Sequence, residues 1–90
     1  MRLDVFLKVS RLVKRRTLAK EYCEEGRVMV GGGPAKPGRE VKPGDMITLE
    51  LARRRVVAEV VEIPAGNVTK EKAASLYRII EDVVIKDEFM

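Results

Sequence analysis

The chain has 90 residues, enough for one domain, and it carries a formal net charge of +4 with one cysteine and no histidine. The single cysteine excludes an internal disulfide, and the absence of histidine removes the commonest catalytic base and zinc ligand. No apolar run approaches the roughly 20 residues of a membrane span. We therefore expect a soluble cytoplasmic protein that is not an enzyme, uses no cofactor and no metal, and does not enter a membrane.

The positive charge is concentrated in two places. Residues 1–20 hold seven Lys or Arg against one acid, and Arg53, Arg54 and Arg55 form a second cluster. The stretches 21–52 and 56–90 are both net acidic. A basic surface kept for solubility usually interleaves both signs, so this segregation favours a patch that binds a polyanion such as RNA.

The first predicted element is a short helix over residues 2–9, with an apolar stripe at the spacing i, i+3, i+4 formed by Leu3, Phe6 and Leu7. Asp4 lies in its first turn, where an acid suits the helix dipole. Its carboxylate could equally orient Arg2 or another basic side chain, and both interpretations stay open. Residues 10–13 are expected to connect to the next helix.

The second predicted helix has its charges reversed relative to the helix dipole. Thr17 is the expected N-cap and Gly26 the expected stop. Basic residues crowd the start and acids close the end, namely Lys14, Arg15, Arg16, Glu24 and Glu25. Each misplaced exposed charge costs about 0.3–1 kcal/mol, yet cations beside free backbone N–H groups attract phosphate. A charge arrangement that opposes the helix dipole indicates that these residues serve function rather than stability.

At 100° per residue, the second helix divides into three sectors. One face is apolar and contains Leu18, Ala19, Tyr22 and Cys23. Arg16 and Lys20 lie at the edge of that face, where their stems can pack on the core while their charged heads meet a ligand. Cys23 is expected to be a packed residue, and Tyr22 a residue of the core or its edge, with base stacking as the alternative for Tyr22.

Period-2 patterning then predicts a small sheet. Val28 to Val30 forms a strand, the run Gly31 to Gly33 a hairpin turn, and Lys42 to Asp45 a second turn. Met46 to Leu51 and Val56 to Ile63 form a hairpin with the Arg triplet at its tip. The triplet is either a second phosphate contact, the interpretation we favour, or a charged turn that blocks aggregation.

The C-terminal part predicts a third helix and an acidic tail. Thr69 can cap this helix, whose apolar stripe would contain Ala73, Leu76, Tyr77 and Ile80. The segment from Val83 to Ile85 forms an extra strand, extends the helix or docks elsewhere, and the pattern leaves all three open. We place one domain over residues 1–63, with residues 64–90 packed on it or extending it.

Four sequence stretches resemble the S-four RNA-binding domain of a ribosomal small-subunit protein. They are Arg2-Leu3-Asp4, Ser10 to Lys20, Gly26-Arg27-Val28 and Val41 to Asp45. The whole chain, including Ala73 to Tyr77, is more similar to the RqcP-type proteins of bacterial ribosome-associated quality control. The resemblance implies an α+β fold with the S-four-like (αL) motif, in which two N-terminal helices pack on a small, mainly antiparallel sheet and a C-terminal helix follows.

The resemblance also implies a function and a set of RNA-binding residues. Such proteins bind an obstructed large ribosomal subunit through 23S rRNA and peptidyl-tRNA, and they support a partner protein that extends the stalled chain with alanine. By position, Arg2 and Arg16 match the principal RNA contacts. Weaker matches on the same surface are Lys8, Arg11, Lys14, Arg15, Thr17 and Lys20. We expect a ribosome-associated monomer.

Three alternatives compete with this interpretation. A heat-shock-type recycling factor for large subunits shares the domain, but commonly has a longer basic extension, whereas residues 81–90 here are net acidic. An RNA-binding module of a pseudouridine synthase or tRNA ligase would require the chain to be a fragment. A protein-interaction adaptor would use the sheet and the acidic tail.

Overall fold

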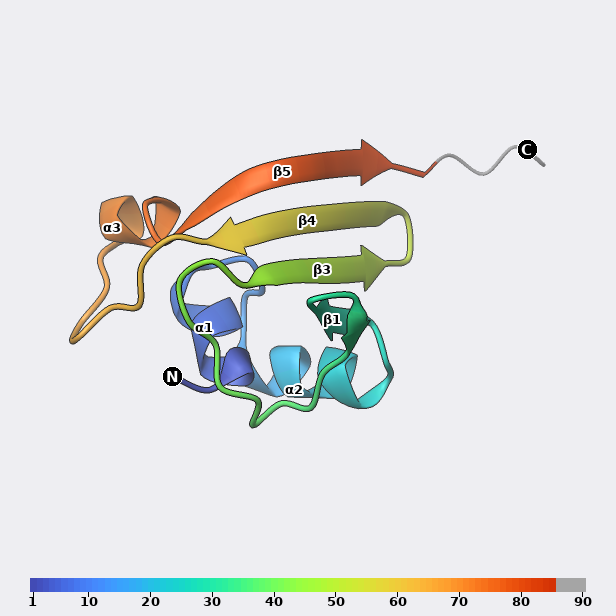
Figure 1. Ribbon diagram of the computed structural model, residues 1–90, viewed down its shortest axis with the longest axis horizontal. Coiled ribbons are helices and arrows are strands. Elements are labelled where there is room, and N and C mark those ends of the chain that lie inside the picture. The colour runs from blue at the N-terminus through green and yellow to red at the C-terminus, as the bar shows by residue number, and fades with distance from the viewer. Residues whose placement is uncertain (86–90) are drawn as a thin grey trace.

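The computed structural model describes residues 1–85, in which three helices pack on a five-stranded antiparallel sheet (Figure 1). The strand order is β2-β1-β3-β4-β5, and the strands are β1 (Val28–Val30), β2 (Gly33–Pro34), β3 (Met46–Leu51), β4 (Arg54–Val60) and β5 (Tyr77–Val84). Helices α1 (Leu3–Val9) and α2 (Arg16–Glu24) lie on one side of the sheet, and α3 (Lys70–Ala74) precedes β5 at its end. The expected α+β, S-four-like class is confirmed.

The core lies between the two N-terminal helices and the sheet. Alternate residues of each strand point to one face, so Val28, Ile47 and Val56 are buried against the helices. Full burial of one such side chain contributes about 1.5–3 kcal/mol. The whole cluster contains Leu3, Phe6, Leu7, Val13, Ala19, Cys23, Val28, Val30, Ala35, Val41, Ile47, Leu49, Val56, Val60 and Leu76.

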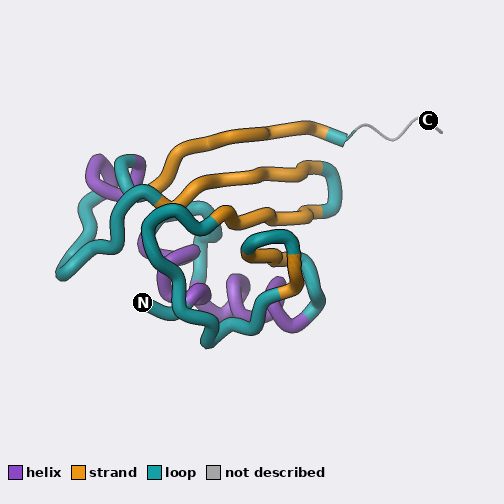
Figure 2. Tube along the Cα trace, in the orientation of Figure 1, coloured by secondary structure: helices purple, strands orange, loops and turns teal. Residues whose placement is uncertain are grey.

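The two predicted turns are confirmed. Gly31 and Gly32 have φ values of 63° and 91° between the paired residues Val30 and Gly33, the geometry of a two-residue type I′ hairpin. Gly44 has a φ of 96° in the second turn, at the end of the loop between β2 and β3. These angles are strained for any residue with a Cβ, so glycine fixes both turns. The loop between them (Figure 2, teal) brings residues 35–41 beside the N-terminus.

The β3–β4 hairpin is confirmed, but the position of the Arg triplet in it is corrected. Strand β4 begins at Arg54 rather than Val56, and Arg54 pairs with Leu51 across the hairpin. Arg54 and Arg55 therefore lie within the strand, and Arg53 alone of the three is in the turn. The strand also ends at Val60 rather than Ile63, so it is shifted toward the turn. Strand β5 runs alongside it, and its carboxylates Asp82 and Glu81 pair with Arg54 and Arg55, a long-range pairing that local sequence cannot reveal.

The predicted third helix is correct at its start and wrong at its end. The Thr69 hydroxyl accepts a hydrogen bond from the Lys72 N–H at 3.1 Å, which confirms the cap. The helix ends at Ala74, and Tyr77 and Ile80 of the expected stripe lie in β5 instead. Aromatic and β-branched residues favour a strand, and the exposed edge of β4 offers a pairing partner. Of the three possibilities for Val83 to Ile85, the extra strand is the one observed for Val83 and Val84.

Strand β5 joins the C-terminal segment to the same sheet as the first sixty residues. It pairs with β4 along its whole length, with a bulge between Val57 and Ala58. Leu76, directly before it, is fully buried in the shared core. The boundary after residue 63 stays a prediction, and the last five residues of the expected acidic tail lie outside the described residues. No helix within residues 1–85 is both long and apolar enough to cross a membrane.

Candidate nucleic-acid interface

Helix α2 begins two residues earlier than expected, so the assignment of Thr17 as its N-cap is wrong. Arg15 occupies the N-cap position in an extended conformation, and its side chain makes no capping hydrogen bond. The Arg15 carbonyl accepts the first helical hydrogen bond from the Ala19 N–H at 3.0 Å. Thr17 lies inside the first turn. That turn contains no acid and the last turn no base, so the reversed charge pattern is confirmed.

Asp4 is a buried carboxylate that holds two arginines from different helices. Its Oδ1 accepts from the Val5 N–H at 2.8 Å and from Arg2 Nε at 3.2 Å. Its Oδ2 accepts from Arg16 Nε at 3.4 Å. The Asp4 side chain is 1% exposed, whereas those of Arg2 and Arg16 are 53% and 56% exposed. Asp4 is therefore the orienter of Arg2, and it fixes Arg16 as well.

The N-terminal segment that carries Arg2 is itself fixed by the β2–β3 loop. The Leu3 N–H donates to the Arg39 carbonyl at 2.7 Å, and the Val41 N–H donates to the Met1 carbonyl at 3.0 Å. Arg2 forms an isolated bridge with Glu40 between these bonds. The position of Arg2 thus depends on backbone pairing as well as on its ion pair.

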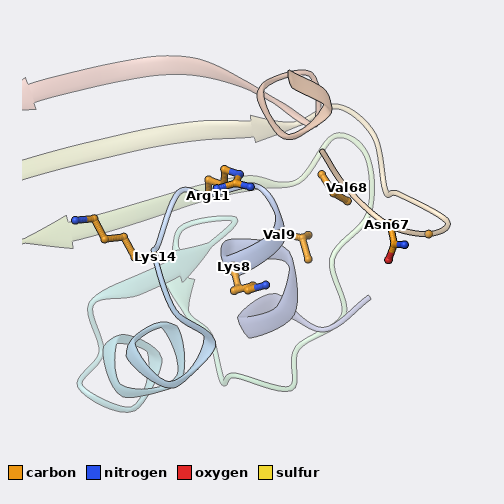
Figure 3. Close-up of a pocket in the computed structure, with 7 residues that line it drawn as sticks. Lys8, Val9, Arg11, Lys14, Asn67 and Val68 are labelled. Carbon is orange, nitrogen blue, oxygen red and sulfur yellow. The ribbon is translucent and has the colours of Figure 1, made fainter. Parts of the chain in front are cut away.

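The eight predicted RNA-binding residues lie along three adjoining hollows, which we call the basic track. The first hollow, of about 350 Å³, is lined by Arg2, Asp4, Arg16, Thr17 and Lys20. The second, of about 480 Å³, shares Thr17 with the first and is lined by Lys14, Arg15, Thr17, Leu18 and Glu21. The third, of about 440 Å³, shares Lys14 with the second and is lined by Lys8, Val9, Arg11, Lys14, Gly66, Asn67 and Val68 (Figure 3). The structure brings the eight together, and their contact with RNA stays a prediction.

Arg11 has an unusual backbone conformation within the track. Its φ is 63°, in the left-handed region that a residue with a Cβ adopts at a cost of about 1–2 kcal/mol. It follows the C-cap of α1, where glycine is common. The Arg11 N–H donates to the Lys8 carbonyl at 3.0 Å, and the buried Ser10 hydroxyl donates to the Leu7 carbonyl at 3.2 Å. An arginine at a position suited to glycine indicates a use for its side chain.

The Arg triplet lies apart from the basic track. Arg54 and Arg55 line a separate hollow with Glu50, Leu51 and Ile85. Arg54 donates to both oxygens of Asp82 at 2.8 and 2.6 Å, and these hydrogen bonds hold the pKa of the Asp82 carboxyl below its ordinary value. Arg55 lies 3.8 Å from Glu81. Two of the three arginines are thus paired, and a second RNA contact at Arg53, Arg54 and Arg55 stays a prediction.

Cys23 packs in the core as expected. Burial raises the pKa of its thiol to about 11, and the nearby carboxylates of Asp4 and Glu24 add to this shift. The thiol is therefore neutral at physiological pH and a poor nucleophile. Within residues 1–85, no group of three or more His, Cys, Asp or Glu side chains could hold a metal ion.

Sequence reasoning missed three polar residues beside the track. Lys36 and Arg39 line a fourth hollow of about 660 Å³ that also contains Arg2 and Lys20. Asn67 lines the third hollow from a loop more than fifty residues away in the chain. Basic residues on both sides of Pro37 were a weak signal for the first two, whereas nothing local marked Asn67.

Comparisons with known proteins agree on one family. Residues 1–47 match the S4 domain. The chain is 48% identical over 89 residues to the RQC P-site tRNA stabilizing factor of Halalkalibacterium halodurans. The matched region covers 98% of this chain and 100% of that protein. The trimeric structure of Vibrio cholerae heat shock protein 15 matches with a TM-score of 0.80 and 33% identity, over 88% of this chain and 80% of that one. The solution structure of hypothetical protein HP1423 matches with a TM-score of 0.77 and 36% identity, over 90% of this chain and 98% of that one.

Proposed function

The chain belongs to the family of RQC P-site tRNA stabilizing factors, which carry an S4 domain, and from this membership we propose that it holds peptidyl-tRNA on an obstructed large ribosomal subunit. The observation that carries the proposal is the basic track, in which the Asp4 carboxylate holds Arg2 and Arg16 with both side chains half-exposed. The protein acts as a binding factor, without chemistry of its own.

The track suits recognition of structured RNA through its backbone. Phosphate contacts position a protein on RNA, and double-stranded RNA is recognised mostly by shape because its major groove is too narrow for side chains. The aromatic residues of the N-terminal helices, Phe6 and Tyr22, are buried or packed against the core. Stacking of unpaired bases on them is therefore a minor contribution.

We assign the finer contacts as follows. Arg2 and Arg16, with Thr17 and Lys20, bind phosphates at the first hollow, while Lys14 and Arg15 extend the contact toward Lys8 and Arg11. The RNA consists of a 23S rRNA stem-loop and the peptidyl-tRNA beside it. By holding both, the protein keeps the tRNA in place while a partner protein of the quality-control pathway extends the stalled chain with alanine.

Binding to purified large subunits tests this function. Subunits that carry peptidyl-tRNA and vacant subunits are pelleted with increasing amounts of the protein, and the bound fraction is measured. We expect tighter binding to the tRNA-bearing subunits, and loss of most binding in Arg16→Ala. The control Lys70→Ala removes an exposed cation outside the track and should bind as the wild type does. Equal binding of Arg16→Ala and the wild type would refute the assignment.

A heat-shock-type recycling factor is the second candidate, because the fold matches heat shock protein 15 of Vibrio cholerae at 33% identity. The two candidates differ in what happens to the stalled chain. If the proposed function holds, deletion of the gene abolishes alanine tails on stalled chains in cells. If tails persist at the wild-type level while obstructed subunits accumulate, the recycling function replaces it.

A further inference from the structure

We propose that the third hollow of the basic track is a cleft for a backbone phosphate of the bound RNA, and that residues 66–68 form its second wall. The proposal rests on the proposed function and extends it to a segment that lies outside the S4-domain match over residues 1–47. The loop between β4 and α3 thereby becomes part of the RNA-binding surface.

The cleft is built from two segments that are distant in sequence. Lys8 and Val9 come from α1, and Arg11 from the connection that follows it. Asn67 and Val68 come from the loop opposite (Figure 3). Lys14 extends away from this loop, at the end where the cleft joins the second hollow. A ligand seated between Arg11 and Asn67 would therefore lie on the same path as the rest of the track.

The charge of the cleft is unbalanced. Its lining contains three cations and no acid. Among residues 1–85, no carboxylate lies within 4 Å of Lys8, Arg11 or Lys14, whereas Arg2 and Arg16 pair with Asp4, Arg54 with Asp82 and Arg55 with Glu81. Like charges in one hollow repel one another, and an anion that enters relieves this repulsion.

The lining of the cleft includes two apolar residues that are anchored to the core. Val9 and Val68 are half-buried and pack against the core, as does Ile63 at the start of the loop. Apolar side chains beside the cations lower the local polarity, which strengthens the interaction of the cations with a phosphate. The Asn67 amide can donate hydrogen bonds to a phosphate oxygen without adding charge.

The backbone of Arg11 points to the same use. Its left-handed conformation places an arginine at the mouth of the cleft, in a position that glycine would occupy without strain. Arg11→Gly therefore tests the side chain separately from the fold, because it removes the guanidinium while glycine adopts the left-handed conformation without strain. The variant should fold, with a melting temperature equal to or above that of the wild type.

Binding to purified large subunits carrying peptidyl-tRNA measures the role of the cleft. We expect Arg11→Gly to weaken binding about 10-fold or more, as loss of a charge-assisted hydrogen bond does, and to lower the salt slope of binding by about one unit. Asn67→Asp places a carboxylate in the cleft and should weaken binding by a similar factor. Its matched control is Ala65→Asp, which adds the same charge to the same loop outside the cleft and should change binding less than threefold.

The possible outcomes separate this inference from the proposed function. If the wild type does not bind these subunits, the function itself fails. If the wild type binds and Arg16→Ala does not, while Arg11→Gly and Asn67→Asp bind like the wild type, the cleft is refuted and the function stands. Inorganic phosphate is added as a competitor at an ionic strength matched with sodium chloride. Competition beyond the chloride control that is lost in Arg11→Gly would support a phosphate site at the cleft, whereas equal competition in the wild type and Arg11→Gly would place the phosphate elsewhere and count against the cleft.

Discussion

At the scale of single residues, the Asp4 carboxylate is the group on which the interface depends. It is buried and accepts hydrogen bonds from Arg2, Arg16 and the Val5 N–H. Asp4→Asn keeps the shape and one acceptor but removes the charge. We expect the free energy of unfolding to fall by about 1–3 kcal/mol, because bonds between the carboxylate and charged donors are lost, and RNA affinity to fall with it.

Denaturant unfolding and RNA binding of the same preparations check this prediction. Glu71→Gln is the matched control, because it is an equally conservative loss of one carboxylate at an exposed site on α3. It should leave RNA affinity unchanged and lower the free energy of unfolding by no more than about 0.3–1 kcal/mol, because Glu71 lies in the first turn of α3. An Asp4→Asn protein that binds RNA as tightly as the wild type would show that the carboxylate does not position the arginines.

Arg16→Ala should separate binding from stability. The variant loses an ion pair with Asp4 but also removes a cation from the start of α2, and each effect is below about 1 kcal/mol for a half-exposed side chain. We expect the free energy of unfolding to change by less than ~0.5 kcal/mol, while RNA affinity falls roughly 10- to 100-fold. Thermal melts and RNA titrations measure the two effects. Unfolding of the variant would mean that Arg16 is structural.

At the scale of elements, the first turn of α2 contains cations that lower the stability of the helix and that we expect to bind RNA. Arg15 occupies the N-cap position without capping the helix. Arg15→Ser should supply a capping oxygen and remove a repelled cation, raising the free energy of unfolding by about 1 kcal/mol, while RNA affinity decreases. For stability, the control Arg53→Ser makes the same exchange in the β3–β4 turn, outside any helix, and should not raise the free energy of unfolding. A loss of stability in Arg15→Ser would contradict the interpretation of this turn.

The ion pair between Arg54 of β4 and Asp82 of β5 depends on pH. The hydrogen bonds from Arg54 hold the pKa of Asp82 below its ordinary value of 3.8, so they stabilise the fold above that pH and are lost as the pH falls through the lowered pKa. Asp82→Asn should therefore be less stable than the wild type at pH 7, and the difference should vanish in acid. Thermal melts from pH 7 to pH 2 measure it. A difference that is the same at every pH would exclude this ion pair as its cause.

The elements differ in how well the sequence predicts them. The faces of α1 and α2, the glycine turns and the β3–β4 hairpin follow local periodicity and turn chemistry, and all are confirmed. Strand β5 was predicted only in part: a strand was one of three possibilities for Val83 to Ile85, whereas Tyr77 and Ile80 were placed in the helix. Its pairing with β4 joins residues 17 to 30 positions apart and contains a bulge, which local sequence does not reveal. The N-cap of α2 was missed because capping preference points to Thr17, whereas the chain enters the helix at Arg15.

At the scale of the whole molecule, the eight predicted residues form one continuous surface. The sequence predicted that they share a surface but did not predict the shape of that surface. Charge segregation and helical angles grouped Arg16 with Lys20, and both line the first hollow. The division into three hollows depends on the β4–α3 loop reaching α1, and the support of Arg2 depends on residues 35–41. Neither of these long-range contacts leaves a local signal in the sequence.

The track as a whole predicts a strong salt dependence. If about five phosphates are contacted, log affinity for structured RNA should fall with log salt at a slope between about −3 and −5. Titrations from 50 to 300 mM salt measure this slope. A nearly flat dependence would mean that the cations of the track do not neutralise phosphates.

Sedimentation of the tagged protein from cells tests the central claim most directly. The lysate is separated on a gradient, and each fraction is probed for the protein and for peptidyl-tRNA. The account predicts that the wild type migrates with free large subunits that carry peptidyl-tRNA, and that Arg16→Ala shifts toward the top of the gradient. A wild-type protein found only in the ribosome-free fractions would contradict it.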